Sequence, residues 1–213
     1  MNIEKVTKTL VLNSSDSETM REQIRTYFHQ TFSIEEKLYE TLKQDSTFYL
    51  RADPLRHPII FYLGHTACFY INKLNLAKII TERINPAYES MFAVGVDEMS
   101  WDDLNEASYD WPRVSEVKAY RDQVRAFMDK LISELPLQMP INWNSQWWPI
   151  IMCIEHERIH LETSSVLIRQ LPLDEVKQFD FWSICPESGI PPQNELIPVK
   201  GGLVKLGKSK DNP

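Results

Sequence analysis

The fold is decided by the stretch Ile154-Glu155-His156-Glu157-Arg158-Ile159-His160-Leu161-Glu162. His156 and His160 are four residues apart, so an α-helix places both imidazoles on one face, one turn apart. That arrangement offers two nitrogen ligands to one metal ion. The alternative is that both histidines are core or surface residues hydrogen-bonded to their neighbours. The pair by itself does not decide between these interpretations.

The surrounding sequence favours a helix from Ser145 to Leu171. The segment contains no glycine, and Pro149 lies near its start, where a missing N–H costs little. Apolar residues supply much of one buried stripe: Ile150, Ile151, Ile154, Leu161, Val166, Leu167 and Leu171. We therefore expect the two histidines in or near a core, where an unpaired imidazole is costly.

Three further helices are predicted upstream. Residues 15–44 read as one long helix that begins with a capping box on Ser15. Residues 58–81 form the second, which is apolar almost all round at its start and so is expected to be central. Residues 116–135 form the third, with Ser115 as its N-cap. Four long helices predict an all-α four-helix bundle.

Two segments do not read as long helices. Residues 83–113 are irregular and contain acidic residues and two tryptophans, which indicates either a surface loop or a pocket wall. Residues 196–207 are predicted to form two short strands around a Gly-Gly pair. A lone hairpin is marginal in water, so we expect it to open a second, truncated domain. We place a helical domain at residues 1–185, and a linker with these strands at 186–213.

The composition excludes several classes of protein. The apolar fraction is 43%, which predicts a real core. The formal net charge of -7 argues against nucleic acid or an anionic membrane surface as a partner. No apolar run is long enough to span a bilayer, and no signal peptide is recognised. The three cysteines are Cys68, Cys153 and Cys185. They form no C-x-x-C pair and predict no disulfide framework, which favours a cytoplasmic protein.

A catalytic metal site commonly needs a third protein ligand. His65 is the best candidate, because it lies in the middle of the second helix beside Gly64. A helix-interior glycine costs up to about 1 kcal/mol relative to alanine, and close approach of another group to the backbone compensates. His57 is better placed for a local hydrogen bond, and His29 is expected to be exposed or satisfied in the core.

The sequence His156-Glu157-Arg158-Ile159-His160 also spells H-E-x-x-H, in which a zinc metalloprotease uses the glutamate as general base. The longer protease pattern fails, because Thr163 and Val166 stand at its glycine and histidine positions. Glu162 has two interpretations: contact with a metal ligand or a substrate, or a salt bridge with Arg158.

The chain resembles the DinB-like domain of iron-dependent sulfoxide synthases, and most closely the ovothiol branch, 5-histidylcysteine sulfoxide synthase. The resemblance covers nearly the whole chain after about residue 20. It is carried by Leu63-Gly64-His65-Thr66, by His156-x-x-x-His160-x-Glu162, and by the stretches 51–70, 92–104 and 154–172. The tail from Pro198 to Gly207 is similar to the first strands of the formylglycine-generating-enzyme-like domain that follows in this family.

The resemblance implies a facial Fe(II) site at His65, His156 and His160, the three residues chosen above. It also implies O2, L-cysteine and L-histidine as substrates, and a sulfoxide product with a new carbon–sulfur bond. The family's catalytic tyrosine lies in the missing downstream domain. We therefore expect a fragment that binds metal without turnover. The alternatives are a stand-alone DinB-like thiol transferase or hydrolase using zinc or nickel, and a non-catalytic bundle.

Overall fold

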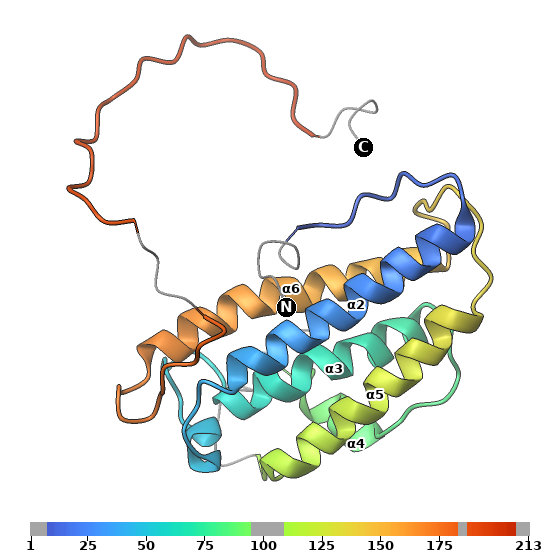
Figure 1. Cartoon of the computed structure of the whole chain (residues 1–213), viewed down its shortest axis with the longest axis horizontal. Coiled ribbons are helices and arrows are strands. Elements are labelled where there is room, and N and C mark those ends of the chain that lie inside the picture. Colours follow the sequence, from blue (N-terminus) through green and yellow to red (C-terminus); the bar gives the residue numbers. More distant parts are fainter. Residues whose placement is uncertain (1–7, 95–108, 183–186, 208–213) are drawn as a thin grey trace.

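Four long helices form a bundle in the computed structural model, which describes residues 8–94, 109–182 and 187–207 (Figure 1). They are α2 (Ser17–Tyr39), α3 (Ile59–Leu76), α5 (Val114–Glu134) and α6 (Trp147–Gln170). Two short elements accompany them, the 3-10 helix η1 (Asp45–Tyr49) and the helix α4 (Pro86–Met91). Both α2 and α3 pack against α5 and α6, so the four long helices enclose one core. The prediction of an all-α four-helix bundle is confirmed.

The first helix is shorter than predicted at both ends. Its N-cap is Asp16, whose carboxylate accepts a hydrogen bond from the backbone N–H of Thr19 at 2.8 Å, so the cap at Ser15 was wrong by one residue. The helix ends at Tyr39, before the predicted residue 44. There Leu42 forms an antiparallel bridge with Val176, and this pairing diverts the backbone out of the helix.

The other helices begin and end within a few residues of their predicted bounds. α3 ends at Leu76 rather than at residue 81, and Lys78 follows with a φ of 59°, which a continuing helix cannot adopt. α5 begins at Val114, with Arg113 rather than Ser115 as its N-cap. The carboxylate of Glu116 accepts a hydrogen bond from the backbone N–H of Arg113 at 2.8 Å.

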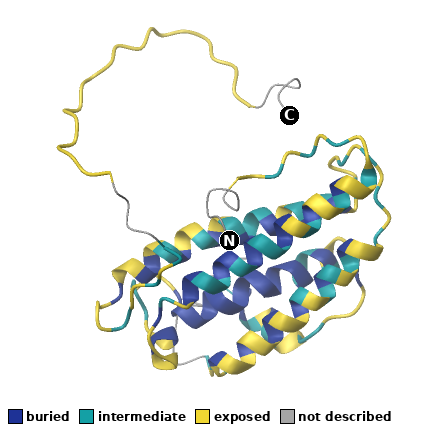
Figure 2. Cartoon of the chain, viewed as in Figure 1, coloured by how far each residue is buried: buried dark blue, intermediate teal, exposed yellow. Residues whose placement is uncertain are grey.

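The second long helix lies at the centre, as its composition predicts. Every residue of α3 from Ile59 to Ile71 is buried, whereas α2, α5 and α6 each expose one side (Figure 2). The irregular segment 83–113 contains α4, which the Asn85 side chain caps. Its Trp101 and acidic residues 97–103 lie outside the described residues. Trp111 packs against the ring of Phe92, with ring centroids 6.0 Å apart.

The predicted strands of the C-terminal tail are not formed. Residues 187–207 are exposed throughout and include no strand (Figure 2). The physical reason is the one already given: a single hairpin with no surface to pack on is marginal in water. The assignment of this tail to a second domain stays a prediction. Among the described helices, none combines the length and the apolarity that crossing a membrane requires.

Candidate metal centre

His65 lies in a crowded interior position, as the neighbouring glycine predicts. The side chain is fully buried in the middle of α3. A Cβ atom added at Gly64 would lie 2.6 Å from the ring of Phe92, which follows α4. Glycine is therefore required here because the Phe92 ring lies directly against the helix backbone.

The same residue, Phe92, orients the imidazole of His65. The Nδ1 atom of His65 lies 2.6 Å from the backbone carbonyl oxygen of Phe92. A carbonyl oxygen only accepts hydrogen bonds, so Nδ1 carries the proton and donates. In a neutral imidazole the lone pair is then on Nε2. This is the usual arrangement of a metal-binding histidine, in which one ring nitrogen is held by the protein and the other binds the ion.

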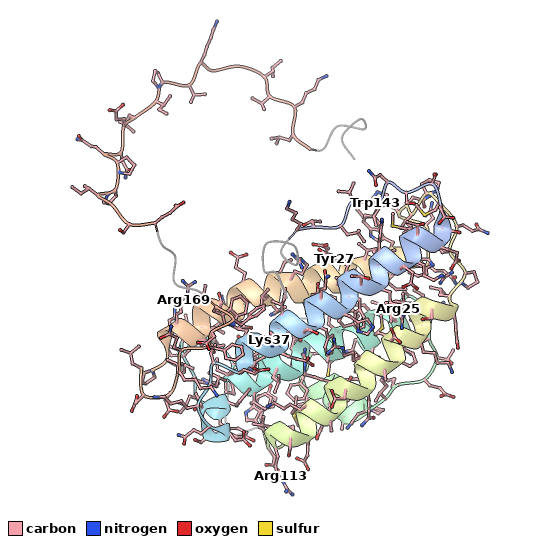
Figure 3. All side chains as sticks on the ribbon, in the orientation of Figure 1. Arg25, Tyr27, Lys37, Arg113, Trp143 and Arg169 are labelled. Atoms are coloured by element: carbon pink, nitrogen blue, oxygen red, sulfur yellow. The ribbon has the colours of Figure 1, made fainter. Side chains whose placement is uncertain are left out.

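The other two histidines meet His65 from α6. Figure 3 labels Trp143, which precedes α6, and Arg169, in the last turn of that helix; in the sequence, His156 and His160 lie between these two residues. Their Nε2 atoms are 3.2 Å apart, and one nitrogen from each of the three histidines lies within 4.8 Å of the others. Two nitrogens that are each about 2.1 Å from one ion are themselves about 3 Å apart. The Nε2 atoms of His156 and His160 therefore have the spacing of two ligands of one ion, and a nitrogen of His65 lies close to both.

Burial keeps the two α6 imidazoles neutral. Burial, together with the neighbouring His160 and His65, lowers the pKa of His156 to about 2. Burial and the neighbouring His65 likewise lower the pKa of His160 to about 3. A metal ion binds the neutral form, so no proton competes for these nitrogens at neutral pH. Aromatic rings adjoin the cluster, with Phe69 stacked on His156 at 3.4 Å.

Glu157 does not belong to the histidine cluster. Its carboxylate is fully buried and accepts hydrogen bonds from Arg121 at 3.3 Å and from the Tyr70 hydroxyl at 2.7 Å. Burial and the nearby Glu35 raise the pKa of Glu157 well above its ordinary value. It is thus not a solvated residue, and it is already engaged on another side of the helix. The H-E-x-x-H pattern is therefore not a metalloprotease site here.

Glu162 lies on the exposed side of α6. It lines a groove of about 690 Å³ between α6, the end of α2 and the segment after α6. Leu38, Arg158 and Trp182 are among the other lining residues, and the three clustered histidines are not. A role for Glu162 beside a metal ligand or substrate stays a prediction.

The remaining histidines have protein partners, although the partner of His57 is 37 residues away in the chain rather than local as predicted. His57 is buried, with its Nε2 3.2 Å from the carbonyl oxygen of Val94. His29 is half-buried, and its Nε2 lies 2.6 Å from a carboxylate oxygen of Asp129. Cys68 and Cys153 are buried free thiols, and Cys185 lies outside the described residues.

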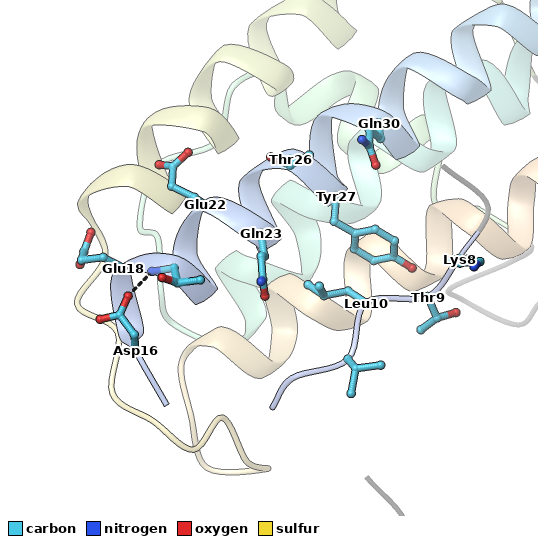
Figure 4. A pocket seen from close by; sticks show the side chains of 12 residues that line it. Lys8, Thr9, Leu10, Asp16, Glu18, Glu22, Gln23, Thr26, Tyr27 and Gln30 are labelled. Atoms are coloured by element: carbon cyan, nitrogen blue, oxygen red, sulfur yellow. Dashed lines mark hydrogen bonds between the residues drawn. The ribbon is translucent and has the colours of Figure 1, made fainter. Parts of the chain in front are cut away.

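A second groove shows that cavity size does not identify the site. It measures about 790 Å³ and lies between α2 and the segment that precedes it, near Leu10 and Tyr27 (Figure 4). The lining mixes apolar and polar side chains, and no histidine or cysteine contributes to it. Its chemistry therefore offers no nitrogen or sulfur ligand to a metal.

Sequence reasoning missed two partners of the site. Phe92 is 27 residues from His65, and no local pattern joins them. Arg121 is 1% exposed, although it is charged. A signal for it was present, because it lies four residues from Val117 and three from Val124, on the apolar face of its helix. A charged residue in that register indicates a buried polar partner.

Comparison with protein families gives a match that covers most of the bundle. Residues 27–164 match the DinB superfamily, and this match extends over more than half of the chain and includes all three clustered histidines. A search of curated proteins gave no match. The matched segment runs from the middle of α2 to the later turns of α6, so it contains the bundle core and the candidate metal ligands. The chain belongs to the DinB superfamily.

Proposed function

We propose that this chain is the metal-binding domain of a non-haem, Fe(II)- and O2-dependent sulfoxide synthase that joins L-cysteine to L-histidine. The observation that carries the proposal is the convergence of His65, His156 and His160 on one point inside a DinB-type bundle. The sequence resemblance supplies the reaction and the substrates. The geometry of the histidines supports the metal site alone.

The donor set fits the proposed ion. Three neutral imidazoles suit Fe(II), and they also suit zinc, nickel and copper. Iron held by three protein ligands leaves coordination positions open and supplies one-electron chemistry with O2. The hydrogen bond from His65 to the Phe92 carbonyl fixes which nitrogen faces the ion.

The residues around the histidines have separate roles in this proposal. Phe69, stacked on His156, shields that imidazole from water on one side. Tyr62 lies beside His160, with ring centroids 6.1 Å apart, and adds to the apolar wall. Glu162 is proposed to contact substrate or a ligand-bearing group once a downstream domain covers it. That domain is expected to supply the catalytic tyrosine.

An anaerobic titration tests the metal site. The purified chain is expected to bind one Fe(II) ion, and His65→Ala is expected to abolish tight binding. His29→Ala is the matched control, because His29 is a partly buried histidine outside the cluster. Failure of the unmodified chain to bind Fe(II), Zn(II) or Ni(II) would contradict the proposal.

A turnover assay tests the reaction. The chain, alone and joined to the residues that follow it in any longer protein, is supplied with Fe(II), O2, L-cysteine and L-histidine. Mass spectrometry is expected to detect a cysteine–histidine sulfoxide from the longer protein and none from the chain alone. Metal binding without sulfoxide in both would reject the synthase.

A zinc- or nickel-dependent thiol transferase or hydrolase is the second candidate. It is favoured by two observations: the superfamily match covers the bundle alone, and the imidazole set accepts zinc as readily as iron. Competition between Fe(II) and Zn(II), followed by assays with thiol substrates, separates the two candidates.

A further inference from the structure

A buried polar cluster joins all four long helices beside the histidines. Arg121 of α5 donates through Nη2 to Glu35 of α2 at 3.0 Å and to Glu157 of α6 at 3.3 Å. α3 contributes two hydroxyls: Thr66 donates to Glu35 at 2.8 Å, and Tyr70 donates to Glu157 at 2.7 Å. All five side chains are buried. We refer to these five residues as the Arg121 cluster.

Two members of the cluster are sequence neighbours of metal ligands. Thr66 follows His65 on α3, and Glu157 follows His156 on α6. Consecutive residues of an α-helix point about 100° apart. Each of these helices is therefore held by the Arg121 cluster on one side and presents its imidazole on the adjoining side. A rotation of either helix that broke the cluster would also turn its histidine away from the others.

Arg121 also holds the backbone of α3 close to His65. Its Nη1 donates to the carbonyl oxygen of Leu63 at 2.9 Å and to the hydroxyl of Thr66 at 2.7 Å. The guanidinium lies over the ring of Phe32, with its central carbon 4.3 Å from the ring centroid. A guanidinium is planar and its donors have fixed directions, so these contacts constrain orientation as well as distance.

Stability alone is a weak reason for this arrangement. Burying an arginine with carboxylates carries a large desolvation cost, and an apolar replacement of similar volume is often as stable. What such a cluster adds is a defined relative orientation of the elements that it joins. Here those elements include both helices that supply the histidines.

We propose that the Arg121 cluster positions the metal ligands by fixing the rotation of α3 relative to α6. The inference rests on the proposed metal-binding function and deepens it. None of the five side chains is a ligand in this proposal, so Arg121 and its partners are positioning residues. They act on the ion through the backbone of the helices that carry the histidines.

Co(II) binding to the purified chain tests this inference, with Arg121→Met and Tyr70→Phe as the test variants. Replacement of groups that orient metal ligands commonly costs about 10- to 100-fold in affinity. Arg121→Met is expected to fall in that range and to shift the visible absorption bands of bound Co(II). Tyr70→Phe removes a single hydroxyl and is expected to weaken binding about threefold or more, with a smaller shift.

Arg125→Met is the matched control. Arg125 lies one turn later on α5, and in the described part of the chain its polar contacts are all to α2: Glu36, Ser33 and His29. The Arg125→Met variant therefore loses an ion pair between α5 and α2 and leaves the contacts of α5 with α3 and α6 unchanged. Its Co(II) affinity is expected to stay within about twofold of the unmodified chain, with the same absorption bands.

The outcomes separate the inference from the function on which it rests. Unchanged Co(II) affinity and spectrum in both test variants, with lower resistance to urea, would mean that the cluster is purely structural and would overturn the inference. No Co(II) binding by the unmodified chain would overturn the inference and the metal site together. If Arg121→Met does not fold by circular dichroism, Tyr70→Phe decides alone.

Discussion

His29 and the cluster of His65, His156 and His160 differ in how their ring nitrogens are used. Between α2 and α5, His29 donates from Nε2 to Asp129 at 2.6 Å and accepts at Nδ1 from Arg125 at 3.2 Å. Between α3 and α6, the Nδ1 atoms of His156 and His160 are buried and have no hydrogen-bond partner in the described residues. Their Nε2 atoms face each other. A histidine whose two ring nitrogens both pair with other side chains stabilises the fold, whereas histidines whose Nε2 atoms converge offer those nitrogens to one ligand.

The largest expected effect comes from removing one of the clustered histidines. His156→Ala removes one ligand of the proposed ion and is expected to lower Zn(II) affinity by at least about 100-fold, more than loss of an orienting group. His29→Ala is expected to leave that affinity within about twofold. Isothermal titration calorimetry measures both. Equal losses of Zn(II) affinity in the two variants would mean that His29 and the clustered histidines do not differ in their role.

The second effect acts on the orientation of His65. Gly64→Ala places a Cβ atom 2.6 Å from the buried Phe92 ring. Overpacking of this kind costs about 1–3 kcal/mol of stability, and displacement of the Phe92 carbonyl is expected to cost about tenfold in metal affinity. Urea unfolding and metal titration measure the two losses.

A glycine outside the bundle is the control for that change. Gly201 has no atom within 4 Å of an added Cβ, so Gly201→Ala is expected to change neither quantity measurably. Adding Phe92→Leu to Gly64→Ala is expected to recover part of both losses, since it relieves the clash and keeps the backbone carbonyl. A Gly64→Ala variant with unchanged stability and affinity would show that the close approach is unimportant.

The third effect concerns pH. The pKa values of His156 and His160 in the folded chain, about 2 and about 3, lie below the ordinary value of 6.5. The unfolded chain therefore binds more protons below pH 6.5, and stability is full above that pH and falls as the pH drops towards 3. Each histidine contributes up to about 1.4 kcal/mol per pH unit in that window.

Urea unfolding of the metal-free chain at pH 7, 6 and 5 measures this loss. The double variant His156→Ala/His160→Ala is expected to lose less stability between pH 7 and pH 5 than the unmodified chain does. Parallel pH curves for the two proteins would rule out neutral, buried imidazoles at these positions.

The smallest effect is expected from a change at the partner of His29. Asp129→Asn removes the carboxylate that pairs with Arg25 at 2.7 Å and with His29 at 2.6 Å. Exposed pairs of this kind contribute little to stability because solvent screens them, so a small loss in urea unfolding is expected, with no change in metal affinity. A tenfold loss of metal affinity would mean that the contacts of His29 also affect the metal site, which would contradict the comparison.

The sequence predicted the elements of the site better than its surroundings. The four-residue spacing of His156 and His160 and the glycine beside His65 are local patterns. What they predict depends on residues close together in the sequence and not on how distant helices pack. The apolar start of α3 likewise predicted a central helix. No sequence pattern identified Arg121 as a partner of Glu157, because their contact depends on how the four helices assemble.

The errors at helix ends have a similar origin. Ser15 and Asp16 are both good N-cap residue types, so the residue types alone do not decide between them, and the structure has Asp16. The early end of α2 follows from pairing between Leu42 and Val176, which are far apart in the chain. The tail at 196–207 has a strand-like pattern but no neighbouring strand to complete it in the described residues.

The sharing of one arginine by two carboxylates also constrains how this sequence can change during evolution. Loss of Arg121 alone would leave Glu35 and Glu157 buried without the guanidinium that both contact, which is severely destabilising. Loss of one glutamate would leave a single ion pair, which is tolerable. Substitutions in this cluster are therefore expected in a fixed order, in which one of the two glutamates is replaced before Arg121. Related chains that lack Arg121 are expected to lack at least one of these two glutamates.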